Sequence, residues 1–77
     1  MEYEELMQLA EKDPAVLRVA LSGMTANELT GTLKHSAEFL KNMNVRDPRN
    51  IKVFAAMMEL LADEFEARFE RKWGSAE

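Results

Sequence analysis

Apolar residues recur at intervals of three and four between Asp47 and Trp73, which is the spacing of one face of an α-helix. A helix that is apolar over most of its circumference must be covered on several sides. We therefore predict that a long helix over residues 48–73 organises the chain. Its first apolar stripe comprises Ile51, Phe54, Met58, Leu61, Ala62, Phe65, Phe69 and Trp73, and a second set comprises Val53, Met57 and Leu60.

Two shorter helices are predicted at the start of the chain. The first covers residues 2–12 and ends at Asp13-Pro14, because the residue before a proline is pushed away from helical angles. The same dipeptide can begin a second helix over residues 14–22, with the aspartate as N-cap and the proline in the first turn. Gly23 is expected to end that helix.

A third helix is predicted over residues 26–44. Its start, Thr25-Ala26-Asn27-Glu28, fits the capping box, in which the threonine and the glutamate each satisfy a free backbone N–H group. Helical spacing places six residues on the face that we expect to be buried: Leu29, Leu33, Ser36, Ala37, Leu40 and Met43.

The expected fold class is all-α: one domain, residues 1–77, forming a small bundle of three to four helices with a long C-terminal helix. The short connection between the third and fourth helices favours antiparallel packing of the two. Residues 74–77, which follow Trp73, are expected to form a frayed tail. The chain is close to the size at which a single core is only marginally stabilising, so a helix-mediated dimer is also expected.

The long helix supplies the predicted interface. So short a chain is not expected to cover both of its apolar sides, and exposed aromatic patches of this kind mark interfaces. The alternative is a monomer in which the first helix folds back over the C-terminal half of the long one. The predicted interface residues are Val53, Met57, Leu60, Phe65, Phe69 and Trp73, and the expected partners are a second copy of the chain and a larger protein.

The charge distribution adds a second candidate surface. The net charge is −4, which disfavours nonspecific binding to DNA or anionic membranes, but the middle of the chain is basic and both ends are acidic. Four bases are predicted to cluster where the third and fourth helices meet, beside the positive end of the latter: Lys41, Arg46, Arg49 and Lys52. An acidic partner or an anion could dock there; alternatively, these residues only keep a loop soluble.

Catalytic, cofactor and metal sites are not expected. His35 is the only histidine and there is no cysteine, so a histidine-rich zinc site cannot form within one chain. Carboxylates four residues apart, such as Glu59 and Asp63, lack the inward Glu-x-x-His motifs of di-metal bundles. We therefore expect no enzyme activity. No apolar run is long enough for a membrane span, and the acidic start differs from a secretory signal, so a cytoplasmic location is expected.

One short stretch bears on DNA binding. Met24-Thr25-Ala26-Asn27-Glu28-Leu29, followed by Leu33-Lys34-His35-Ser36, resembles the beginning of many helix-turn-helix domains. The resemblance implies a turn at residues 34–36 and a recognition helix after it, within residues 26–44. That helix would offer few bases for phosphate contacts. The function expected first is a small non-catalytic interaction protein, an adaptor, regulator or inhibitor similar in size and acidity to phage and mobile-element regulators; the alternative is a dimeric helix-turn-helix transcriptional regulator.

Overall fold

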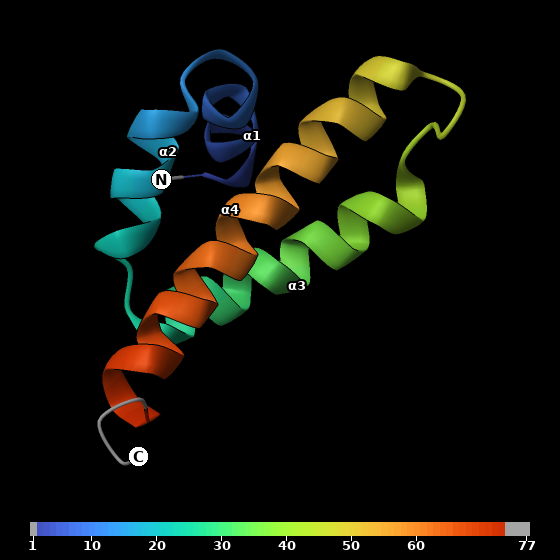
Figure 1. Ribbon diagram of the computed structural model, residues 1–77. Coiled ribbons are helices and arrows are strands. Elements are labelled where there is room, and N and C mark those ends of the chain that lie inside the picture. The colour runs from blue at the N-terminus through green and yellow to red at the C-terminus, as the bar shows by residue number, and fades with distance from the viewer. Residues whose placement is uncertain (1, 74–77) are drawn as a thin grey trace.

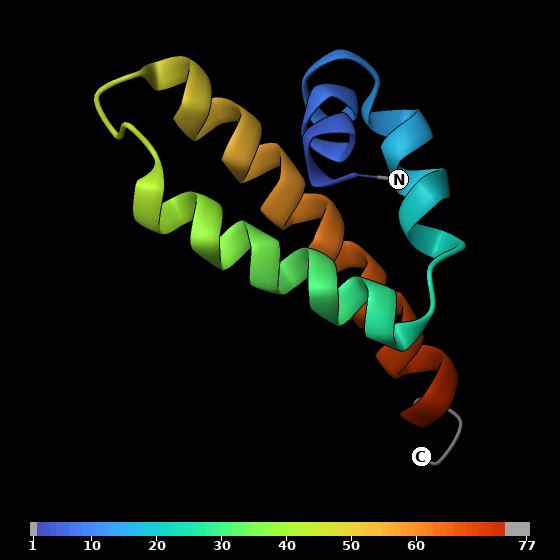
Figure 2. The same ribbon diagram turned by 180° about the vertical axis from the view of Figure 1, so that it is seen from behind.

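The computed structural model describes the backbone of residues 2–73 and the side chains of residues 2–68. Its elements are four helices: α1 (Tyr3–Lys12), α2 (Pro14–Ser22), α3 (Ala26–Asn42) and α4 (Pro48–Trp73). The all-α fold class is therefore confirmed for the described residues. In both ribbon views, α1 and α2 gather on one side of the long helix α4, and α3 lies toward its other side (Figure 1, Figure 2).

The helix starts follow the capping signals of the sequence. The Asp13 carboxylate accepts a hydrogen bond from the backbone N–H of Val16 at 3.4 Å, and Pro14 occupies the first turn of α2. At α3 the capping box is complete: Thr25 Oγ1 accepts from the Glu28 N–H at 3.2 Å, and Glu28 Oε1 accepts from the Thr25 N–H at 2.9 Å. Because each cap lies within four residues, no distant contact is needed to specify it.

Two helix ends differ slightly from the prediction. α1 begins at Tyr3 because Glu2 has extended backbone angles. α3 ends at Asn42, two residues early, because Met43 is extended and Asn44 is used in the loop instead. There the side-chain oxygen of Asn44 accepts a hydrogen bond from the Arg46 N–H at 3.1 Å, and the backbone carbonyl oxygen of Asn44 accepts one from the Asp47 N–H at 3.1 Å. The expected frayed tail lies outside the described residues.

The turn implied by the helix-turn-helix resemblance is absent. α3 is one continuous helix through residues 34–36. The Thr32 hydroxyl donates to the carbonyl of Glu28 at 2.9 Å, and the Ser36 hydroxyl donates to that of Thr32 at 3.0 Å. That expectation is therefore wrong, and residues 26–42 form a single helix.

The hydrophobic core lies where α1, α2 and α3 meet α4. Leu17 and Leu21 of α2 and Leu29 of α3 are almost fully buried. The buried apolar residues are Leu6, Met7, Ala10, Leu17, Leu21, Leu29, Met57, Leu60 and Leu61. Since α1, α2 and α3 all contact α4, which contributes Met57, Leu60 and Leu61 to the core, α4 is the central element, as predicted.

Candidate functional site

One side of α3 is apolar and uncovered. Leu33 and Leu40 are 45% and 49% exposed, and Ala37 between them is also exposed. At 100° per residue, these three lie on the side of α3 turned away from His35, whose ring stacks on Tyr3 of α1 at 5.9 Å. The other helices therefore do not cover this side of α3.

α4 continues the same uncovered surface. On one side of α4, Asp63 binds Arg18 of α2 and Arg49 binds Glu11 of α1, both at 3.1 Å, so α1 and α2 cover this side. Ile51 and Phe65 lie on a different side of α4 and are 46% and 38% exposed. We call the combined α3–α4 surface the open face; it comprises Leu33, Ala37, Leu40, Ile51, Met58, Ala62 and Phe65, with Met58 half-buried.

A pair of aromatic rings fixes how the two helices of the open face are aligned. Phe39 of α3 and Phe54 of α4 are stacked, with ring centroids 6.0 Å apart and an angle of 15° between planes. Both are half-buried. Since α3 and α4 run in opposite directions, each step forward along α3 from Phe39 matches a step backward along α4 from Phe54.

The predicted interface residues of α4 divide into three groups. Met57 and Leu60 are 0% and 7% exposed, and Val53 is half-buried against the same core. The expectation that these three would remain uncovered is wrong, because α1 and α2 both pack on their side of α4. Phe65 is exposed on the open face. The side chains of Phe69 and Trp73 lie outside the described part of the structure, so their assignment stays a prediction.

The buried face of α3 also differs from the prediction, which assigned Leu33, Ala37 and Leu40 to the core. Ser36 is buried as predicted, at 1% exposure, and Thr32, which was not assigned to the core, is buried with it, at 7%. Their hydroxyls are satisfied by carbonyls of the preceding helical turn, which removes the usual cost of burying a polar group. In the sequence, the open face of α3 was therefore indicated by apolar residues at positions 33 and 40 next to Thr32 and Ser36, whose hydroxyls can donate hydrogen bonds to carbonyls of the same helix.

The predicted basic corner is only partly free. Lys41, Arg46 and Lys52 are exposed around the end of α3 and the start of α4. Arg49 instead donates from Nε and Nη2 to Glu11 Oε1, at 3.3 and 3.1 Å, and ties α4 to α1. This pair is largely exposed and adds little stability.

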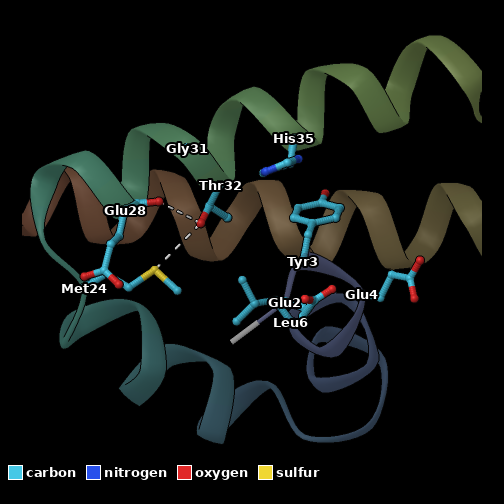
Figure 3. A pocket seen from close by; sticks show the side chains of 9 residues that line it. All are labelled: Glu2, Tyr3, Glu4, Leu6, Met24, Glu28, Gly31, Thr32 and His35. Carbon is cyan, nitrogen blue, oxygen red and sulfur yellow. Dashed lines mark hydrogen bonds between the residues drawn. The ribbon is translucent and has the colours of Figure 1, made fainter.

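A cavity of about 590 Å³ lies between the start of α1, the residues before α3, and α3 itself (Figure 3). Tyr3 points from α1 toward α3, beside His35. Its hydroxyl lies 2.8 Å from Ser36 Oγ. The acidic side chains at the cavity include Glu28, which is already used in the α3 cap. Tyr3 is engaged with Ser36, Thr32 with the carbonyl of Glu28, and Glu28 with the α3 cap, and we assign this cavity no small-molecule ligand.

The Tyr3 hydroxyl gives a direct pH readout of that contact. Burial raises the pKa of Tyr3 above 10.0, while the hydrogen bond with Ser36 opposes the shift. Because the pKa is raised in the folded state, the contribution of the Tyr3 hydroxyl to the free energy of unfolding is full below pH 10 and is lost as the pH rises through the folded-state pKa. Tyr3 is the only tyrosine, so tyrosinate absorbance titrates it alone. We expect a pKa above that of a model peptide, raised further by Ser36→Ala; a normal pKa would contradict the buried contact.

Among the described residues, no group of three or more histidine, cysteine or carboxylate side chains could hold a metal ion. None of the helices, over the residues described, is both long and apolar enough to cross a membrane. No protein-family model, curated protein or solved structure matches this chain. The open face is the candidate functional surface.

Proposed function

We propose that this chain is a non-catalytic protein–protein interaction module that binds through the open face. It would act as an adaptor, regulator or inhibitor, by self-association, by binding a larger protein, or both. The observation that carries the proposal is the open face itself, where large apolar side chains on two adjacent helices remain exposed. Contiguous apolar surface of this kind marks sites of association.

The shape of the open face defines the kind of partner that it fits. Two antiparallel helices present a shallow surface with apolar ridges at helical spacing, and such surfaces accept the apolar stripe of another helix or helix pair. Met58 lies within it and can adapt its shape to a partner. Nucleic acid is not proposed as the partner, because the acids Glu28 and Glu38 accompany Lys34 and Lys41 on α3.

The proposal is tested by photocross-linking in cells that express the chain. A photoreactive amino acid at Leu40, on the open face, should give adducts of discrete mass. The matched control is the same amino acid at Val19 of α2, which is 71% exposed and lies outside the open face. The adducts formed from position 40 should disappear when Ile51→Lys is added. No adduct at position 40, or the same adducts from both positions, would overturn the proposal.

A further inference from the structure

Two adjoining hollows form a groove between α1 and α3, on the side of α3 turned away from the open face. The first is the cavity of about 590 Å³ described above, and the second, of about 540 Å³, lies beyond Tyr3 toward the end of α3. Both are lined by Tyr3, Glu4 and His35, so they meet where α1 contacts α3 (Figure 3). We call the two hollows together the α1–α3 groove.

The floor of the groove is apolar and aromatic. Tyr3 of α1 and Phe39 of α3 line the second hollow together with Met7, and the two ring centroids are 6.3 Å apart. Both rings are half-buried and pack against the core, and Met7 is only 9% exposed. The core therefore holds the floor of the groove in place.

The rims of the groove carry negative charge. Among the described residues that line the two hollows there is no lysine or arginine, and the acids are Glu2, Glu4, Glu28 and Glu38, all exposed. None of these four belongs to an ion pair of the described residues. The hydrogen bond from the Thr25 N–H lowers the pKa of Glu28, so its carboxylate keeps its charge at neutral pH.

Gly31 leaves the edge of the first hollow open. It lies within α3 and has no positive φ, and a Cβ added there would meet no atom within 4 Å. Neither the backbone nor the packing of the fold therefore requires glycine at this position, although glycine lowers the helix propensity. The missing side chain lets the backbone of a partner approach α3 closely.

An aromatic floor between acidic rims is complementary to long basic side chains. The alkyl part of an arginine packs against apolar surface, and its guanidinium group stacks on aromatic rings and donates to carboxylates. The α3 residues that line the second hollow follow those that line the first by seven positions, which corresponds to about 10 Å along the helix. One peptide segment can therefore reach both hollows.

We propose that the α1–α3 groove binds a basic segment of another protein, with arginine or lysine side chains in the two hollows. The net charge of −4 opposes a second copy of the chain as the occupant and favours a basic partner. This inference does not depend on the open face, which lies on the other side of α3. A chain with both surfaces can hold two partners at once.

Binding is measured by fluorescence anisotropy with a labelled peptide of six arginine–alanine repeats. The salt concentration is about 0.15 M, at which attraction between distant exposed charges is screened. The same peptide with citrulline in place of arginine is the ligand control, because citrulline has nearly the same shape but no charge. We expect a dissociation constant on the order of micromolar for the arginine peptide and at least about tenfold weaker binding of the citrulline peptide.

Two pairs of substitutions test the acidic rims. Glu4→Gln combined with Glu38→Gln removes one carboxylate from each side of the second hollow and should weaken the arginine peptide at least about tenfold. The matched control, Glu5→Gln combined with Glu59→Gln, removes the same total charge from exposed positions that line neither hollow. It should change the affinity by less than about twofold. Circular dichroism shows that each variant is folded.

The edge of the first hollow is tested at Gly31. Gly31→Met places a long side chain where the structure leaves open space, so it should obstruct the hollow and weaken the peptide without unfolding the chain. Gly31→Ala adds only a methyl group and should leave the affinity unchanged. Equal affinities of the methionine and alanine variants would exclude the first hollow from the site.

NMR titration with the arginine peptide locates the site. The ring signals of His35, the only histidine, and the methyl signal of Met7 should shift. The methyl signals of Leu33 and Ile51, on the open face, should not. Ile51→Ser should likewise leave the affinity for the peptide unchanged.

Four results would overturn the proposal. They are absence of binding, equal binding of the citrulline peptide, equal losses in the two double variants, and shifts confined to the open face. Shifts of His35 with the concentration of the chain alone would make a second copy the occupant and would also overturn it. None of these results affects the Leu40 adducts, so this inference and the proposed function fail separately.

Discussion

Replacing Met57 by alanine is expected to lower the free energy of unfolding by about 3 kcal/mol, because Met57 is fully buried and its removal leaves a cavity. The same change at the adjacent Met58, which is half-buried, should cost about 1 kcal/mol or less, since only part of its side chain leaves water on folding. Two identical neighbours thus serve as test and control.

Urea unfolding followed by circular dichroism measures this difference. Small domains are stable by only about 5–15 kcal/mol, so the loss at Met57 should shift the unfolding midpoint clearly. A larger loss at Met58 than at Met57 would mean that the other stripe of α4 faces the core. That outcome would restore the assignment made from the sequence and remove the open face.

Replacing Arg68 by alanine is expected to cost about 3 kcal/mol, because charged groups that are partly buried and hydrogen-bonded are expensive to remove. Its Nε donates to Glu64 Oε1 at 2.7 Å. Its Nη2 donates to the carbonyls of Leu21 and Met24, at 3.3 and 2.5 Å. Arg68 therefore ties the end of α2 and the α2–α3 connection to α4.

Arg18 provides the matched control for that prediction. It also binds a carboxylate of α4, Asp63 at 3.1 Å, but the two side chains are 58% and 40% exposed. Solvent screens such a pair, so Arg18→Ala should cost less than about 1 kcal/mol. Thermal unfolding of both variants measures the contrast. If Arg68→Ala were as mild as Arg18→Ala, the contacts with the α2–α3 connection would not stabilise the fold.

The helices could be predicted because their signals are local. Asp13-Pro14 and Thr25–Glu28 specify the starts of α2 and α3 through hydrogen bonds that span three residues. The end of α3 was less predictable, because Asn44 could either extend the helix or form the loop. Such ends depend on competing local bonds of similar strength.

The faces of the helices could not be predicted because they depend on distant neighbours. α4 has two apolar stripes, and periodicity alone does not say which one α1 and α2 will cover. Their packing against Met57 and Leu60 left Ile51 and Phe65 exposed. On α3, Thr32 is buried beside Ser36, while Leu33 and Leu40 are exposed. The candidate site therefore emerges only from tertiary structure, although Phe65 was assigned to it from the sequence.

The most direct test of association through the open face is a dilution series of the unaltered chain followed by methyl NMR. The signals of Leu33, Leu40 and Ile51, which are exposed on the open face, should shift with concentration. Those of Leu17 and Leu21, which are buried by α4, should not. Signals that are all independent of concentration, or shifts confined to Val16 and Val19 on α2, would contradict self-association through this face.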